Sequence, residues 1–251
     1  KIRVYDEDRE IGVVPIKIVI TPQDWLRFAR DAGDARQQIE LLKKALIMNK
    51  EDIGVRKILA GIYSRQGRID DAIAQYKEIL VIKPDDTMAL EELAKCYIKK
   101  NDCDNAINIA RRLAKINPRD AQTYTTLALA LSEKGMWRQA IENYREVIKL
   151  EPDNLAARYK FGQALERERM TDQAIEQYKY IVENSQDTEL ALLALGDVYL
   201  RQQKYAEAIK YYTELVKKNP KITAAYVNLA AAYAGLGKSK EEMESLRQAA
   251  A

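Results

Sequence analysis

The side chains that most often carry out chemistry in proteins are scarce or poorly placed in this sequence. The chain has 0 His, which removes the commonest general base and the commonest imidazole metal ligand. Cys96 and Cys103 match neither a CxxC redox pair nor a set of zinc ligands, so we interpret them as small packing residues. Adjacent acids such as Glu91 and Glu92 would point in different directions on a helix. We therefore expect no catalytic site, no bound metal and no cofactor.

A stronger regularity concerns packing residues. A small residue recurs every 34 residues through most of the chain, and an isoleucine follows it each time. A fixed period of this length indicates a stack of structural units, each of which contacts mainly its neighbours. Repeats must therefore position any functional side chain. The recurring small residues are Ala72, Ala106, Ala140, Ala174 and Ala208.

Each unit is interpreted as two antiparallel helices joined by a short turn. In the unit at residues 53–86, apolar residues recur at helical spacing on both sides of Gly67, which suits the left-handed residue that ends a helix. Asp70 is placed to cap the second helix, and Pro84 stops it. On the first helices we expect small residues to face the second-helix alanines, where a bulkier side chain would cost about 1–3 kcal/mol. These small residues are Ala60, Ala94, Ala128, Gly162, Gly196 and Ala230.

This pattern resembles the tetratricopeptide repeat, a 34-residue helix-turn-helix unit with small, aromatic and proline residues at these offsets. The resemblance is strong for residues 53–236 and weak for residues 19–52. It implies an all-α solenoid of about seven units, wound as a right-handed superhelix. It also implies that a concave wall of first helices holds an extended peptide or a partner helix.

The repeat offsets select the residues expected on this wall. Several cations share one offset and could form a basic ladder for acidic segments. The same offset ends a first helix, where a cation also complements the helix dipole, so both interpretations stay open. The cations of this ladder are Arg65, Lys99, Arg167 and Arg201. The full set of candidate partner-binding residues is Lys57, Arg65, Lys95, Lys99, Thr125, Leu129, Tyr159, Gln163, Arg167, Leu193, Asp197, Arg201, Val227 and Asn228.

The N-terminal residues depart from the helical pattern. Hydropathy alternates around Ile2 and Val4 and again over residues 16–20, which predicts two strands. We expect this short hairpin to cover the open end of the solenoid, because two strands alone are marginally stable in water. The alternative is an extended segment or linker.

The last helix is expected to close the stack. Glu242 replaces the small alanine, while Met243, Leu246 and Ala250 continue the inner stripe. The predicted boundaries are 1–20 for the N-terminal β element or linker, 21–52 for a degenerate first repeat, 53–236 for the regular repeat array and 237–251 for a C-terminal capping helix.

Charge and hydropathy narrow the choice of partner. Lys+Arg of 41 against Asp+Glu of 38 gives a formal charge of +3, too balanced to indicate nucleic acid or an anionic membrane. No apolar run is long enough to span a bilayer, so we expect no membrane insertion of this region. We interpret the chain as a non-enzymatic interaction scaffold whose partner is another protein or peptide.

An alternative interpretation is the soluble region of a membrane-anchored or multidomain assembly factor that self-associates through its solenoid, as a homo-oligomer. The sequence does not give the location; the cytoplasm or, for a bacterial protein, the periplasm would suit this composition.

Overall fold

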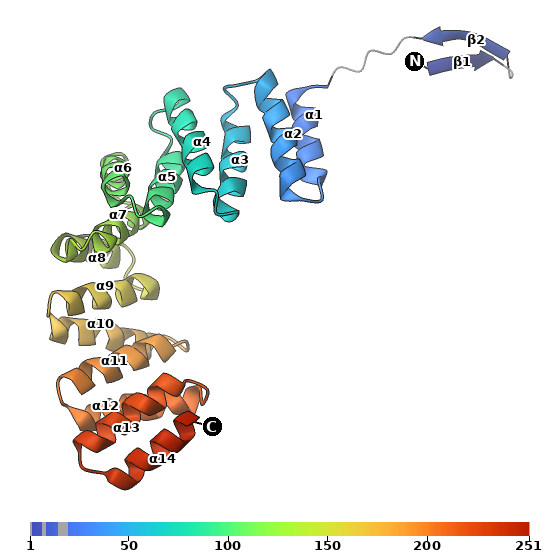
Figure 1. Cartoon of the computed structure of the whole chain (residues 1–251). Coiled ribbons are helices and arrows are strands. Elements are labelled where there is room, and N and C mark those ends of the chain that lie inside the picture. Colours follow the sequence, from blue (N-terminus) through green and yellow to red (C-terminus); the bar gives the residue numbers. More distant parts are fainter. Residues whose placement is uncertain (1, 7–8, 15–19, 251) are drawn as a thin grey trace. The chain divides into compact units, whose positions relative to one another are not determined.

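The structure is a computed structural model that describes residues 2–6, 9–14 and 20–250. Within these residues the chain forms fourteen α-helices and one two-stranded antiparallel sheet (Figure 1). The chain divides into two compact units, residues 1–100 and 101–251. In both units consecutive helices pack as helix-turn-helix pairs, which confirms the helical repeat architecture predicted from the 34-residue period.

The first unit contains the two strands and five helices. Pairs α1–α2 and α3–α4 are antiparallel, and each stacks on the helix that follows it. The bounds are β1 Ile2–Asp6, β2 Arg9–Val14, α1 Pro22–Asp31, α2 Ala35–Met48, α3 Ile53–Arg65, α4 Ile69–Ile82 and α5 Thr87–Lys99.

The second unit contains nine helices within its described residues. Helix α6 packs on α7, and the pairs α7–α8, α9–α10, α11–α12 and α13–α14 follow one another along the chain. The bounds are α6 Cys103–Ile116, α7 Ala121–Glu133, α8 Trp137–Leu150, α9 Leu155–Arg167, α10 Thr171–Asn184, α11 Glu189–Arg201, α12 Tyr205–Lys218, α13 Thr223–Gly235 and α14 Ser239–Ala250.

In the N-terminal hairpin, the strand that pairs with β1 lies earlier in the chain than the sequence pattern indicated. Its second strand runs from Arg9 to Val14 and pairs Arg9 with Asp6, whereas the alternation placed that strand at residues 16–20. Hairpins favour short connections, and here Arg9 and Glu10, which the sequence placed in a polar turn, join the ladder. Residues 15–19 lie outside the described residues, and the cover of the first repeat stays a prediction.

The first helices α1, α3, α5, α7 and α9 begin at side-chain caps, whereas α11 and α13 do not. Thr21 Oγ1 accepts from the Asp24 N–H at 3.3 Å, and the Asp24 carboxylate accepts from the Thr21 N–H at 2.9 Å. This reciprocal pair is the capping box expected before Pro22. In the next four repeats an oxygen at one fixed offset accepts from the N–H three residues later. These caps are Asp52, Asp86, Asp120 and Asn154.

The predicted cap of the second helix by Asp70 is wrong. Helix α4 begins at Ile69, and Arg68 occupies the cap position without a side-chain hydrogen bond. Asp70 lies inside the first turn, where a carboxylate still favours the positive end of the helix dipole. Its Oδ1 accepts instead from Lys100 Nζ at 2.6 Å, so this acid links two neighbouring repeats.

The turn inside each regular pair has one left-handed residue at a constant offset. Glycine occupies this offset in three repeats, where φ is 73° at Gly67, 77° at Gly135 and 70° at Gly237. The remaining repeats hold residues with a Cβ there, which are strained in this conformation. Packing of the helix pair therefore imposes the conformation, whatever residue occupies the turn. The non-glycine residues are Asn101, Arg169 and Gln203, with φ of 60°, 60° and 58°.

Small residues of two first helices lie against tyrosine rings of the second helices. The predicted approach to the second-helix alanines stays a prediction. A Cβ built on Gly162 would lie 2.4 Å from Cε1 of Tyr178, and one on Gly196 would lie 2.4 Å from Cε1 of Tyr212. Both tyrosines are fully buried. Each follows the recurring alanine by one helical turn, so it shares that residue's face and covers the small position.

The last helix also differs from its prediction. Met243 and Leu246 were assigned to the inner stripe, but both are exposed, and Ser245 is the buried residue of α14. Among the described residues helix α14 packs against one neighbouring helix, α13. The sequence pattern identified the apolar face correctly but not what lies against it.

We expect Gly196→Ala to lower the free energy of unfolding by about 1–3 kcal/mol, because the new Cβ would displace the Tyr212 ring. Gly61→Ala is the matched control, since nothing lies within 4 Å of a Cβ added there. The control should be neutral or stabilising by about 0.5–1 kcal/mol. Chemical denaturation followed by circular dichroism measures both. Equal stabilities would mean that the ring moves without cost.

We expect Gln203→Gly to raise the free energy of unfolding by about 1 kcal/mol, because glycine relieves the left-handed strain. Gln203→Ala removes the same side chain but keeps a Cβ, so it should bring no gain. Thermal melting compares the two variants with the parent chain. A similar gain in both would assign the effect to the side chain and contradict the backbone explanation.

Candidate functional site

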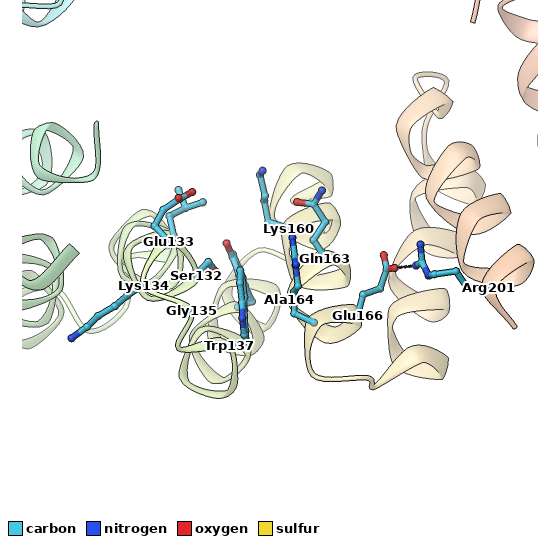
Figure 2. A pocket seen from close by; sticks show the side chains of 13 residues that line it. Ser132, Glu133, Lys134, Gly135, Trp137, Lys160, Gln163, Ala164, Glu166 and Arg201 are labelled. Carbon is cyan, nitrogen blue, oxygen red and sulfur yellow. Dashed lines mark hydrogen bonds and ion pairs between the residues drawn. The ribbon is translucent and has the colours of Figure 1, made fainter. Parts of the chain in front are cut away.

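The second unit contains a cavity of about 860 Å³ lined by α7, α8, α9 and α11. Figure 2 shows Trp137, the first residue of α8, standing between the α7–α8 turn and α9. Glu133, Lys160 and Gln163 project to one side of the cavity, while Lys134 points away from α9. The lining is thus a mixture of aromatic, cationic and acidic groups. Four predicted wall residues are brought together here: Leu129, Gln163, Arg167 and Arg201.

Trp137 and Arg167 form the aromatic centre of this cavity. The guanidinium carbon of Arg167 lies 5.5 Å from the Trp137 ring centroid, within the range of a cation–π interaction. Lys160 and Glu133 are exposed, and neither forms an ion pair within the described part of the chain. Their charges therefore remain available to groups that enter the cavity.

Two buried tyrosines hold polar side chains beside the cavity through hydrogen bonds from their hydroxyl groups. The Tyr178 hydroxyl donates to Glu166 Oε1 at 2.6 Å, and Glu166 also forms an ion pair with Arg201 (Figure 2). The Tyr212 hydroxyl donates to Asp197 Oδ1 at 2.6 Å, and Asn228 Nδ2 donates to the same oxygen at 2.9 Å. Three predicted wall residues, Asp197, Arg201 and Asn228, therefore belong to ordered hydrogen-bond and ion-pair networks.

The other wall residues of the second unit have packing partners or are simply exposed. Tyr159 packs against Tyr178, with ring centroids 5.7 Å apart. Thr125 Oγ1 donates to a backbone carbonyl of its own helix at 2.9 Å. Leu193 is half-buried, whereas Val227 is 46% exposed. The structure gives these four residues no place in the lining of the cavity.

In the first unit, Lys57 has a structural role. Its Nζ lies 3.0 Å from Oδ2 of Asp86, the nearly buried cap of α5. Burial alone would raise the pKa of Asp86, but the Ala89 N–H and Lys57 outweigh burial and lower it. Replacing Lys57 would therefore disturb a helix cap as well as any surface contact.

The remaining cations of the first unit also have local neighbours. Lys95 Nζ bonds to Glu91 at 2.6 Å and Glu92 at 2.9 Å, both on its own helix. Lys99 Nζ lies 3.4 Å from Ser64 Oγ. Arg65 lines a second cavity, of about 240 Å³.

The predicted basic ladder is not tested as one surface, because its members divide between the two units. Within the second unit Arg167 and Arg201 line the same cavity, but Glu166 neutralises Arg201. Each ladder cation also lies in the last turn of its helix, in agreement with the helix-dipole interpretation.

Sequence reasoning missed the side chains that make this cavity distinctive: Glu133, Trp137, Lys160 and Glu166. Trp137 occupies an offset that holds Ile69 and Cys103 in earlier repeats. A bulky aromatic residue at the start of a helix was the available signal. A pattern defined by what all repeats share does not single out a tryptophan that occurs at this offset in one repeat.

The described residues offer neither a metal site nor a membrane-spanning helix. No group of three or more Cys, Asp or Glu side chains is placed to hold a metal ion. No described helix is both long enough and apolar enough to cross a bilayer.

The fold and the cavity define a class of protein: a helical-repeat protein that presents side chains on stacked helix pairs. Tetratricopeptide repeat models match residues 29–91, 65–130 and 193–251. A model described as anaphase-promoting complex, cyclosome, subunit 3 matches residues 99–179. The chain belongs to the tetratricopeptide repeat family, as its spacing of small and aromatic residues predicts. No curated protein matches the sequence.

Solved structures share the fold at low sequence identity. A tetratricopeptide repeat protein from Parabacteroides merdae ATCC 43184 is 17% identical with a TM-score of 0.70, covering 91% of this chain and 92% of its own. YrrB, described as a TPR protein with an unusual peptide-binding site, is 20% identical with a TM-score of 0.62, covering 74% and 96%. MamA from Desulfovibrio magneticus RS-1 is 19% identical with a TM-score of 0.62, covering 66% and 97%.

Buried tyrosines predict alkaline sensitivity. Burial raises the pKa of Tyr144 to about 12, and burial also raises the pKa values of Tyr76, Tyr178 and Tyr212. In the unfolded chain tyrosine titrates near pH ~10. The unfolded state therefore loses protons first, and stability present below that pH should fall as pH rises towards about 12.

Tyrosinate absorbance against pH, recorded with and without denaturant, measures this effect. We expect part of the tyrosine signal to appear only as the helical circular dichroism is lost, and Tyr144→Phe to reduce that delayed part. Complete titration of the tyrosines in the folded chain would contradict the prediction.

Proposed function

We propose that the second unit binds a segment of another protein along its first helices α7, α9, α11 and α13. The observation that carries this proposal is the 860 Å³ cavity, in which Trp137 offers an aromatic surface. Lys160 and Glu133 there have no ion-pair partner in the described residues. Charged groups beside an aromatic ring in a hollow suit polar and apolar groups of an incoming chain.

Apolar side chains extend this surface beyond the cavity. Leu190 on α11 is 62% exposed and Val227 on α13 is 46% exposed, with Leu193 half-buried. Helices α11 and α13 contact each other, and Leu193 and Val227 occupy the same repeat offset on them. Exposed apolar groups of this kind favour a protein partner over a small polar ligand.

The charges favour a partner with an acidic residue near its apolar ones. Lys160 and Arg167 both lie on α9, and the ring of Trp137 restrains Arg167. A carboxylate placed between these cations would gain charge-assisted hydrogen bonds. The carboxylates of Asp197 and Glu166 already accept hydrogen bonds within the chain, so we expect them to attract a cation of the partner only weakly.

The comparisons support the class of function. YrrB is described as carrying a peptide-binding site, and it has the same fold. The absence of histidine and the charge balance also agree with a scaffold that acts by binding and not by catalysis. The partner is therefore proposed as a peptide-like segment that combines apolar and acidic side chains.

An array of synthetic peptides that vary in apolar and acidic content, probed with the full chain, tests the proposal. The chain has 2 Trp, so in a Trp25→Phe background the emission of Trp137 reports binding. We expect apolar–acidic peptides to bind, and the double variant Lys160→Glu with Arg167→Glu to weaken them at least about tenfold. Binding should also weaken with salt, as expected for exposed charge pairs.

Lys149→Glu is the matched control, because Lys149 is an exposed cation on α8 that pairs with Glu146 outside the cavity. It should leave peptide affinity unchanged. Equal weakening by the control would indicate a nonspecific charge effect. Peptides that bind the parent and the double variant equally would place the binding surface elsewhere.

A further inference from the structure

The first unit contains a cavity of about 240 Å³ between its first helix pair, α1 and α2, and helix α3 of the next repeat (Figure 1). Five of its eight lining residues are apolar, and three of these, Ala29, Leu42 and Ile62, are buried. The other three are two arginines and a glutamine, with no acidic residue among them. The larger cavity of the second unit differs, because Glu133 and Glu166 line it beside its cations.

The cavity lies where the first repeat departs from the packing pattern of the next one. Ala29 stands at the offset of Tyr63, and Leu42 stands at the offset of Tyr76. Both tyrosines are buried. The first repeat therefore has smaller side chains where the next repeat has two aromatic rings. The missing volume at this contact accounts for the cavity.

The cavity has a cationic end and an apolar end. Arg30 and Arg65 lie in the last turns of α1 and α3, and the first helices of successive repeats run in the same direction. Gln38 lies in the first turn of α2, which begins beside the end of α1 because the pair is antiparallel. Ile58 precedes Arg65 by about two helical turns, so it lies toward the opposite end.

The charges of both arginines are available to an anionic ligand. Arg30 and Arg65 are exposed, and each ion pair between described residues of the first unit uses another cation. The planar donors of a guanidinium group match a carboxylate, with which they form charge-assisted hydrogen bonds. A phosphate would match them as well, but it would carry more charge into a hollow that is mostly apolar.

We propose that this cavity binds a small free carboxylic acid whose hydrocarbon part is an alkyl chain or an aromatic ring. The carboxylate lies between Arg30 and Arg65, and the hydrocarbon lies against Ile58 and the buried floor. The ligand is small because the cavity is below the range of about 300–1,000 Å³ for drug-sized ligands. A peptide fits less well, because the lining has one neutral polar side chain, Gln38, and buried peptide groups need hydrogen-bond partners.

Isothermal titration calorimetry of the full chain with octanoate and phenylpropanoate tests the proposal. We expect one molecule to bind per chain. Octanol has the same alkyl chain without the charge, so it should bind at least about tenfold more weakly than octanoate. Arg30→Gln with Arg65→Gln should weaken octanoate by a similar factor. The matched control is Arg36→Gln with Lys43→Gln, which should leave the affinity unchanged, because both cations are exposed on α2 outside the lining.

A cavity-filling variant tests the place of the hydrocarbon without changing a charge. Ala29→Leu introduces the residue that the second unit has at this offset in Leu131 and Leu165. The added carbons take space that the ligand needs, so octanoate affinity should fall at least about tenfold. Thermal melting followed by circular dichroism should show that the variant is as stable as the parent chain or more so.

Absence of binding by both octanoate and phenylpropanoate would overturn the proposal. So would equal affinity for octanol, or an octanoate affinity that the arginine double variant or Ala29→Leu leaves intact. Tighter binding of a short peptide with a C-terminal leucine would assign the cavity to a peptide instead. Lys160→Glu with Arg167→Glu should leave octanoate binding unchanged, and a loss would place the ligand in the second unit. The peptide array is decided separately, because its binding surface uses other residues.

Discussion

The structure depends on one packing constraint: each internal second helix must be enclosed by the first helix of its own repeat and by that of the next. A cluster of Ala121, Val147 and Ala157 illustrates it, because these buried residues belong to α7, α8 and α9. Neither helix of a pair could bury its apolar stripe alone. Small residues at these contacts let the three helices pack closely. Because every repeat needs this contact, small residues recur every 34 residues in the sequence.

The candidate site is built on this packing. At Gly162 of α9 and Gly196 of α11, the tyrosine ring of the second helix approaches closely and its hydroxyl reaches a carboxylate near the surface. Tyr178 thereby orders Glu166, which in turn holds Arg201, and Tyr212 orders Asp197. The polar groups of the wall are thus fixed by core residues behind them. Buried hydrogen bonds of this kind limit the conformations that the wall can adopt.

The sequence was sufficient to predict the repeated features, because a signal that recurs in each repeat identifies the packing faces and turns. It was insufficient where one repeat differs from the others or lacks a neighbour. Trp137 lines a cavity in one repeat, and Met243 is 54% exposed although its residue type and offset are typical of the core. The pairing of β1 with Arg9–Val14 could not be predicted, because alternation specifies the face of a strand but not its partner. The cap at Asp70 was predicted wrongly because the start of a helix shifts easily by one residue.

The double role of Asp86 affects how the first unit unfolds. This one carboxylate caps α5 through the Ala89 N–H at 2.9 Å and also holds Lys57 of α3 at 3.0 Å. Fraying at the start of α5 would therefore release an anchor of the preceding repeat as well. Such shared anchors make neighbouring modules melt as a block, and they set the length over which unfolding is cooperative along the array.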